Sequence, residues 1–384
     1  MSVTSAKGFR ASGVAAGLKA SGSRDVALVV NDGPQDAAAA VFTGNRFQAA
    51  PVRWTQQVIA GGRLRAVVLN SGGANACTGP DGFADTHRTA EHVAGVLRVG
   101  AGEVAVCSTG LIGERLPMQA LIAGIDAAAL TMSDDGGPDA ADAIRTTDTV
   151  AKQNEFRHGD GWTLGGMAKG AGMLAPALAT MLCVLTTDAI VEGPTLDTAL
   201  RAAMRHSFDR LDSDGCMSTN DTVLLLASGA SGYRPDPADL AAAVEVVCKQ
   251  LVGQLLADAE GATKEITIDV GGAASEDDAV EVGRAIARSN LLKCALFGND
   301  PNWGRVLAAI GTTRADFDPD LVDVAINGVL VCARGAAGVD RSAVDLSARH
   351  VLIDVDLHAG NVDATVWTND LSHAYVEENS AYSS

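Results

Sequence analysis

Residues 169–182 restrict the fold of this chain more than any other stretch, and they read Lys-Gly-Ala-Gly-Met-Leu-Ala-Pro-Ala-Leu-Ala-Thr-Met-Leu. The two glycines allow backbone conformations that other residues avoid, and the proline fixes a bend. Residues 181–185 form an apolar run that is typical of a buried strand. We therefore expect a flexible loop that enters the core at Thr180, where a hydroxyl group can be held as a nucleophile.

A threonine hydroxyl is a weak nucleophile unless a base lies beside it. One solution is a threonine that begins a chain, because its own α-amine then acts as the base. That amine has a reference pKa of about 8, against about 10.4 for lysine, so a useful fraction is neutral. Thr180 becomes such a residue if the bond between Ala179 and Thr180 is cut. The small side chain of Ala179 leaves the carbonyl of that bond uncovered, and the β-branched Thr180 has few χ1 rotamers.

Residue types alone allow two other interpretations of this stretch. The first is a Gly-rich turn before a core strand, with Thr180 only capping the strand. The second is a dinucleotide-binding fingerprint, because residues 170–175 fit G-x-G-x-x-G/A and Asp188 follows at a suitable distance. The second fails on length, since only five residues separate Ala175 from the next strand and a crossover helix needs about twelve.

Residues 165–182 resemble the self-cleavage segment of ornithine acetyltransferase, the glutamate N-acetyltransferase of arginine biosynthesis. Matching stretches extend over essentially the whole chain, and the clearest of them are residues 70–79, 108–113, 260–264 and 297–305. The resemblance implies an α/β fold of mixed layers, like that of ornithine acetyltransferase and the self-processing aminopeptidases. It also implies that cleavage gives two intertwined chains, one of residues 1–179 and one of residues 180–384.

The resemblance assigns roles outside the central stretch. Thr109 and Gly110 follow a predicted strand at residues 104–107 and match the family's oxyanion-hole motif, although residue types alone indicate only a turn. A hydroxyl group and a backbone N–H aimed at one point stabilise a developing oxyanion. The family's substrate-binding residues correspond here to Thr146, Lys169, Thr180, Glu260, Asn379 and Ser384.

Glu260 lies at the end of the longest predicted helix, residues 238–259, beside Gly261 as its C-cap. A carboxylate is electrostatically unfavourable at a helix C-terminus, and this mismatch favours a functional role. We expect Glu260 to balance the ornithine ammonium group and Lys169 to pair with a substrate carboxylate. A solvated loop lysine is the other interpretation of Lys169. Residues 372–384 would be frayed by their position, but the family folds its C-terminus into the active site.

The resemblance implies two uses of one hydroxyl group. Thr180 first attacks the Ala179 carbonyl, and water opens the resulting ester. The free amine, directly or through water, then deprotonates the Thr180 hydroxyl, which takes the acetyl group of N²-acetylornithine and passes it to glutamate in a ping-pong exchange. Three alternatives stay open: acetyl-CoA as a further acetyl donor, which makes an N-acetylglutamate synthase; water as the acceptor, as in an amidohydrolase or aminopeptidase; and an uncleaved chain that only binds an amino acid.

Charge and cysteine content exclude other classes of protein. A net charge of −18 argues against nucleic-acid and anionic-membrane binding, and the apolar runs are far too short to span a membrane. The seven cysteines show no C-x-x-C spacing, so we expect reduced thiols, with neither a metal site nor a disulfide frame.

We expect a cytoplasmic protein, because the N-terminal segment lacks an apolar signal core. The resemblance implies a heterotetramer of two α and two β chains, with no cofactor unless acetyl-CoA serves as the donor.

Hydrophobic periodicity predicts the remaining elements. Strands are expected at residues 26–30, 37–42, 66–69, 223–227, 266–270, 322–326, 351–357 and 364–367, and helices at 85–97, 117–130, 139–145, 195–206 and 277–288. Residues 208–222 and 297–305 are expected to be structural loops, because the first lacks the register of a calcium loop. No histidine has a Ser or Cys partner at a recognisable spacing, so none is expected to be catalytic.

Overall fold

The computed structural model describes residues 2–174 and 181–381, which form two compact units. The first unit contains the residues up to Asp209 together with Cys216–Leu255. The second contains Arg210–Gly215 and residues 256–381. The division therefore does not fall at residue 180, and the first unit contains residues from both sides of the expected cleavage position.

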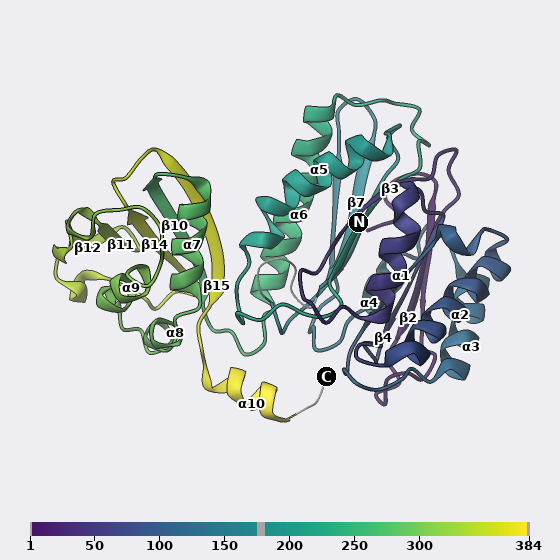
Figure 1. Ribbon diagram of the computed structural model, residues 1–384, viewed down its shortest axis with the longest axis horizontal. Helices are drawn as coiled ribbons and strands as arrows, with labels where there is room; N and C mark the ends of the chain where they lie inside the picture. Colours follow the sequence, from purple (N-terminus) through teal and green to yellow (C-terminus); the bar gives the residue numbers. More distant parts are fainter. Residues whose placement is uncertain (1, 175–180, 382–384) are drawn as a thin grey trace. The chain divides into compact units, whose positions relative to one another are not determined.

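The first unit contains two β-sheets and the helices that cover them (Figure 1). Its strands are β1 Phe9–Val14, β2 Val26–Asn31, β3 Ala37–Phe42, β4 Ala66–Ser71, β5 Val104–Thr109, β6 Lys152–Arg157, β7 Thr163–Lys169, β8 Leu182–Thr187 and β9 Thr222–Ala227. Its α-helices are α1 Ala50–Val58, α2 Gly79–Leu97, α3 Met118–Thr131, α4 Gly137–Ala143, α5 Gly193–Arg205 and α6 Pro237–Ala257.

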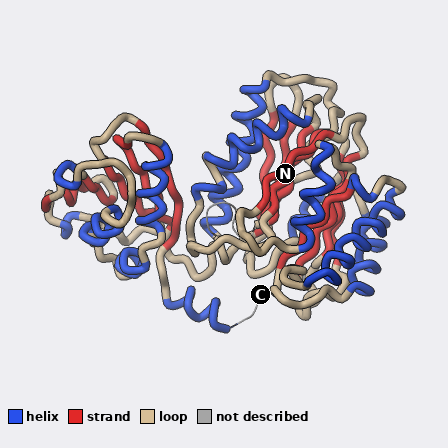
Figure 2. The backbone as a smooth tube through the Cα atoms, viewed as in Figure 1, coloured by secondary structure: helices blue, strands red, loops and turns tan. Residues whose placement is uncertain are grey.

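The two sheets lie face to face, with helices on their outer sides (Figure 2). One sheet has the strand order β1-β2-β4-β5 and the other has the order β3-β9-β8-β7-β6. Alternate residues of β2 belong to different cores, as a side-chain period of two requires. Ala27 and Val29 point into the core between the sheets, whereas Val26, Leu28 and Val30 pack under α2 and α3. This double burial explains why β2, β4 and β5 are apolar except at their carboxyl ends, although every residue in them is buried.

The second sheet interleaves strands from both sides of residue 180. β7 pairs antiparallel with β8, and β8 pairs parallel with β9, which pairs with β3 at the edge. β3, β6 and β7 precede residue 180 in the sequence, and β8 and β9 follow it. A cut at this position would leave two chains that share one sheet and one core, so they could not separate without breaking both.

The second unit is a single six-stranded sheet with helices packed on it. Its strands are β10 Glu265–Ala273, β11 Asp323–Ile326, β12 Val329–Ala333, β13 Ala336–Ala337, β14 His350–Asp356 and β15 Val362–Asn369, in the spatial order β13-β12-β11-β14-β10-β15. Its α-helices are α7 Glu276–Ala287, α8 Asn290–Phe297, α9 Trp303–Ile310 and α10 His373–Ala381. Across both units, short 3₁₀ turns span Ile59–Gly61, Ala101–Glu103, Phe208–Arg210, Pro319–Leu321 and Arg341–Ala343.

The mixed α/β class expected from the sequence is confirmed, and several elements differ in extent. The strand β7 was not predicted, because Gly165 and Gly166 lower strand propensity. A Cβ at Gly165 would come within 2.1 Å of the Ser2 carbonyl oxygen, which shows that β7 needs glycine at this position for close packing. Residues 297–305 are not only a loop, since α9 begins at Trp303.

The longest apolar helix belongs to a protein core. α6 is long and apolar enough to cross a membrane by length and composition alone, and half of its apolar window is buried. Leu240, Val244, Val247 and Leu251 are fully buried. Val247 and Leu251 also line the space beside Gly166 of β7, which places α6 directly on the second sheet.

Candidate active site

The ends of two parallel strands place Thr109 and Gly110. β4 and β5 run side by side, with Ser71 opposite Thr109 at their carboxyl ends. The N–H groups of Gly72 and Gly73 both donate to the Thr109 carbonyl at 3.0 Å. Gly110 has a φ of 129°, which favours glycine. These constraints turn the chain sharply after β5 and fix the backbone on both sides of the Thr109 side chain.

Lys169 brings the second sheet to the same point. It is the last residue of β7, is 1% exposed, and donates from Nζ to the Thr109 hydroxyl oxygen at 3.3 Å. An ammonium group has only donors, so the Thr109 hydroxyl accepts this bond and its own proton is free to point elsewhere. The pair thus supplies a positive charge and an O–H donor at one place, as stabilisation of an oxyanion requires.

Asp148 is the anion that compensates this buried charge. Its Oδ1 accepts from Lys152 Nζ and from the Gly170 N–H, both at 2.6 Å, and its Oδ2 accepts the Thr146 N–H at 3.0 Å. Burial opposes ionisation of Asp148, but Lys169 and Lys152 outweigh it and lower its pKa to about 2. One carboxylate therefore holds the segment of Thr146 and the start of the Gly-rich loop together.

A second buried carboxyl group lies on the other side of that loop. Asp221 precedes β9, is fully buried, and accepts the Met181 N–H at Oδ1 over 2.9 Å. Asn220 donates to the carbonyls of Ala74 at 2.6 Å and Ser108 at 2.8 Å. These bonds join the segment before β9 to the ends of β4 and β5, so both sheets contribute to one polar region.

In the second unit, Glu260 and Asn379 are connected through the start of α10. Glu260 is only 7% exposed. Ser372 Oγ donates to the Gly261 carbonyl at 2.5 Å and accepts the Tyr375 N–H at 3.0 Å, and Asn379 donates to the Tyr375 carbonyl at 3.0 Å. Burial, Asp214 and Glu260 together raise the pKa of Tyr375 well above its usual value. The Glu260 turn and α10 are therefore packed together in this unit.

The expected helical setting of Glu260 is wrong. α6 ends at Ala257, not at residue 259, so Glu260 lies in a turn beyond the helix. Gly261 does adopt a left-handed conformation, with a φ of 61°, but a Cβ there would collide with the backbone of Tyr375. Close approach of α10 is thus a second reason for this glycine.

The structure brings Thr109, Gly110, Thr146 and Lys169 into one region of the first unit through the bonds given above. Glu260 and Asn379 belong to the second unit. Ala179, Thr180 and Ser384 lie outside the described residues, so their expected roles stay predictions. Among the described residues that precede Thr180 in the sequence, Met173 has a φ of 57°, a conformation that residues other than glycine rarely adopt.

Asp148, Lys152 and Asp221 are the residues of this region that sequence reasoning missed. Lys152 is completely buried although it is charged, and its bond to Asp148 helps to compensate that charge. The spacing of this pair is the sole signal in the sequence, and the same spacing is common on solvated surfaces. Asp221 gives no signal, because its partner Met181 is distant in the sequence.

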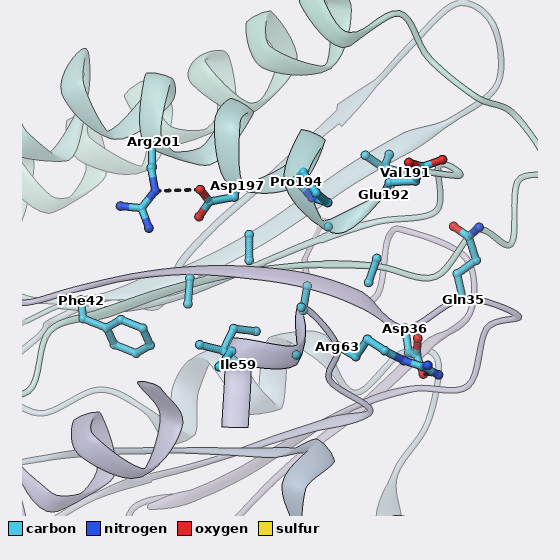
Figure 3. Close-up of a pocket in the computed structure, with 18 of the residues that line it drawn as sticks. Gln35, Asp36, Phe42, Ile59, Arg63, Val191, Glu192, Pro194, Asp197 and Arg201 are labelled. Atoms are coloured by element: carbon cyan, nitrogen blue, oxygen red, sulfur yellow. Dashed lines mark hydrogen bonds and ion pairs between the residues drawn. The ribbon is translucent and has the colours of Figure 1, made fainter. Parts of the chain in front are cut away.

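A separate groove in the first unit lies along β3 (Figure 3) and has a volume of about 780 Å³. Its floor contains four consecutive alanines, and its charged residues are paired, Arg63 with Asp36 at 2.7 Å and Arg201 with Asp197 at 2.8 Å. It contains none of the expected site residues. Within residues 2–174 and 181–381, no three His, Cys, Asp or Glu side chains are grouped as metal ligands.

The sequence is similar to the ArgJ family over residues 10–384, where the family model matches. The arginine biosynthesis bifunctional protein ArgJ of Thermobifida fusca is 64% identical over 383 residues, which cover all of both chains. The protein of the same name from Mycobacterium tuberculosis is 61% identical over 389 residues, covering all of this chain and 96% of that protein.

Two solved structures each match about half of the chain. One is ornithine acetyltransferase from Mycobacterium tuberculosis complexed with ornithine, 64% identical over 46% of this chain and 94% of that chain, with a TM-score of 0.45. The other is arginine biosynthesis bifunctional protein argJ from Bacillus halodurans, 35% identical over 51% of this chain and 97% of that chain, with a TM-score of 0.49.

Proposed function

The chain belongs to the ArgJ family, and from this premise we infer that it is an ornithine acetyltransferase of arginine biosynthesis. It is an acyltransferase that transfers the acetyl group of N²-acetylornithine to glutamate. The observation that carries this conclusion is the identity of 64% over the full length of a relative named for arginine biosynthesis. The buried cluster of Thr109, Asp148 and Lys169 is consistent with chemistry that develops negative charge on an oxygen.

The proposed nucleophile is Thr180, freed as a chain start by cleavage after Ala179. Its amine takes the hydroxyl proton, the oxygen attacks the acetyl carbonyl, and the leaving nitrogen of ornithine regains a proton. Thr109 Oγ and the Gly110 N–H are proposed to stabilise the oxyanion. The contact between Lys169 and Thr109 supports this role, because it leaves the hydroxyl proton free to donate. Glutamate then attacks the acetyl-threonine ester, which regenerates the hydroxyl.

Substrate binding is proposed for Thr146, Lys169, Glu260, Asn379 and Ser384. Lys169 suits the substrate carboxylate, and Glu260 suits the side-chain ammonium of ornithine. The burial of both Lys169 and Glu260 supports these assignments, because desolvated charges bind opposite charges more strongly than solvated ones do.

We also propose that the cleaved chains, residues 1–179 and 180–384, assemble as two copies of each in the cytoplasm. The interleaved strands around residue 180 support a stable association of the two chains. A second activity is favoured by the word "bifunctional" in the names of the relatives. On this proposal, acetyl-CoA also donates the acetyl group to Thr180, and the enzyme is then an N-acetylglutamate synthase.

Acetyl transfer with purified protein tests the proposal. Incubation with N²-acetylornithine and glutamate, without coenzyme A, is expected to give ornithine and N-acetylglutamate in equal amounts. Release of free acetate without N-acetylglutamate would instead indicate a hydrolase, and binding without turnover would indicate an amino-acid-binding protein. A parallel reaction with acetyl-CoA and glutamate measures the second activity separately.

A further inference from the structure

Asp221 and the residue after it hold Met181 on both of its backbone polar groups. Asp221 Oδ1 accepts the Met181 N–H at 2.9 Å, and the Thr222 N–H donates to the Met181 carbonyl at 3.1 Å. Asp221 is completely buried, as is the strand β9 that follows it. The position at which the chain enters β8 is therefore fixed by β9 and by this one carboxyl group.

We propose that Asp221 is a positioning residue for the reactions of Thr180, because its carboxyl group fixes the N–H of Met181, the next residue in the chain. A peptide group is planar, so an N–H held in place also fixes the plane through which residue 181 is joined to residue 180. The inference rests on the proposed function, since it requires Thr180 to be the nucleophile.

The charge state of Asp221 suits this role. Burial raises the pKa of Asp221 well above its usual value, although the Met181 N–H, Lys169 and Ser218 favour the ionised form. Burial therefore favours the neutral form of this carboxyl group. An ionised carboxylate so close to a new α-amine would favour the protonated amine, which cannot accept the hydroxyl proton. A neutral acid can hold the backbone without weakening that base.

The two anchors of the Gly-rich loop thus differ in charge. Asp148 holds the Gly170 N–H as an ionised carboxylate that two lysines stabilise. Asp221 holds the Met181 N–H without a bonded cation among the described residues. One anchor therefore compensates the charge of Lys169, whereas burial favours the uncharged form of the other.

Asp188 offers a matched control at the opposite end of the same strand. It directly follows β8, is also completely buried, and also accepts backbone N–H groups, from Thr163 at 2.7 Å and Lys7 at 3.1 Å. Loss of either aspartate leaves buried backbone donors without their acceptor. Of these two aspartates, only Asp221 holds Met181, the residue next to the expected cleavage position. We therefore expect the loss of Asp221, and not that of Asp188, to affect the reactions of Thr180 selectively.

The test compares Asp221→Leu, Asp221→Ala and Asp221→Asn with Asp188→Leu, using pulse-labelled full-length chain and a denaturing gel to follow self-cleavage. We expect Asp221→Leu and Asp221→Ala to cleave at least about 30-fold more slowly than wild type. Asp221→Asn keeps a neutral acceptor oxygen and is expected to stay within about threefold of wild type, as is Asp188→Leu. In the cleaved fraction of Asp221→Ala, kcat should fall about tenfold with an unchanged KM.

Three results would overturn the inference. Wild-type cleavage rates in both Asp221→Leu and Asp221→Ala would show that the carboxyl group is not needed. An equal loss in Asp188→Leu would reduce Asp221 to a general stabiliser of β8. A loss of about 30-fold in Asp221→Asn would mean that an acceptor oxygen is not enough, and that the carboxyl group acts through its proton or its charge instead. Failure of the proposed function looks different, because wild type would then give no fragment beginning Thr-Met-Leu-Cys.

Discussion

The ammonium nitrogen of Lys169 lies 3.3 Å from the hydroxyl oxygen of Thr109, although the two residues are 60 positions apart in the sequence. The contact crosses from the second sheet to the first, because Lys169 ends β7 and Thr109 ends β5. Both side chains are about 1% exposed. Any negative charge that develops beside Thr109 is therefore stabilised by a cation and an O–H donor in a region of low dielectric constant.

Removal of the Lys169 charge should disable catalysis more than folding. Lys169→Met is expected to lower kcat/KM for N²-acetylornithine by at least about 30-fold, since the negative charge that develops beside Thr109 loses a buried cation. Lys152→Met is the matched control, because Lys152 is equally buried and its ammonium group also stabilises the Asp148 carboxylate. We expect that variant to lose stability in thermal unfolding while its cleaved form keeps activity within about fivefold. Equal kinetic losses in both would contradict a specific role for Lys169.

Thr109→Val tests the oxyanion role through a change of nearly constant volume. Loss of one oxyanion donor typically costs about 10²–10³-fold in kcat, and we expect a value in that range with little change in KM. Thr89→Val serves as the control, since Thr89 is also buried but donates to the Asp85 carbonyl within α2, at 2.8 Å. The measurement is steady-state acetyl transfer. If Thr109→Val keeps near-wild-type kcat, another group must stabilise the oxyanion.

Self-cleavage should be visible on a denaturing gel. Purified protein is expected to give two bands, for residues 1–179 and 180–384, and the second fragment should begin Thr-Met-Leu-Cys on Edman sequencing. Thr180→Ala should remain a single chain, because it has no hydroxyl group to attack the Ala179 carbonyl. Thr180→Ser keeps a hydroxyl group and should still cleave. Continued cleavage of Thr180→Ala at the same bond would exclude Thr180 as the nucleophile.

The sequence predicted those parts of the fold whose signal is local. β3 spans the expected residues 37–42, and α5 and α7 begin and end within two residues of their predicted limits, because apolar periodicity reports one-sided burial directly. β7 was missed for the opposite reason. Gly165 is required because the backbone of Ser2 approaches it closely, and that approach is a tertiary property that no local pattern contains.

In the candidate site as well, residues with a recognisable local signal were predicted and residues that depend on tertiary packing were not. Thr109, Thr146 and Lys169 were identified through the family resemblance, and the structure places them in one hydrogen-bonded region. Asp148 and Asp221 were not found, because an aspartate that accepts backbone N–H groups in a core has the same local sequence as one in a solvated turn. Their roles depend on burial and on partners supplied by distant strands.

Ser372→Ala should weaken substrate binding through the second unit. Ser372 caps the start of α10, since its hydroxyl accepts the Tyr375 N–H and donates to the Gly261 carbonyl. Loss of such a cap costs about 1 kcal/mol, and the helix that carries Asn379 should then fray. We expect KM for N²-acetylornithine to rise about fivefold with kcat nearly unchanged.

Ser289→Ala is the control. It removes the cap of α8, where Ser289 accepts the Leu292 N–H at 3.3 Å, and it should leave KM unchanged. An unchanged KM in Ser372→Ala would argue against substrate contact by α10.

Acid should destabilise the protein partly through Asp148. Its pKa is lowered to about 2 in the folded protein from its ordinary value of 3.8, so its stabilising contribution is nearly complete above pH 4 and is lost as the pH falls from about 4 to 2. The full contribution is about 2 kcal/mol, at about 1.4 kcal/mol per pKa unit. Asp148→Asn cannot gain a proton there, so the difference in unfolding free energy between the two proteins should shrink as the pH is lowered. Urea denaturation in the uncut Thr180→Ala background, at pH 6 and pH 3, measures this difference with a single chain. A difference that is the same at both pH values would show that Asp148 does not titrate with a lowered pKa, and the charge of Lys169 would then need another compensating anion.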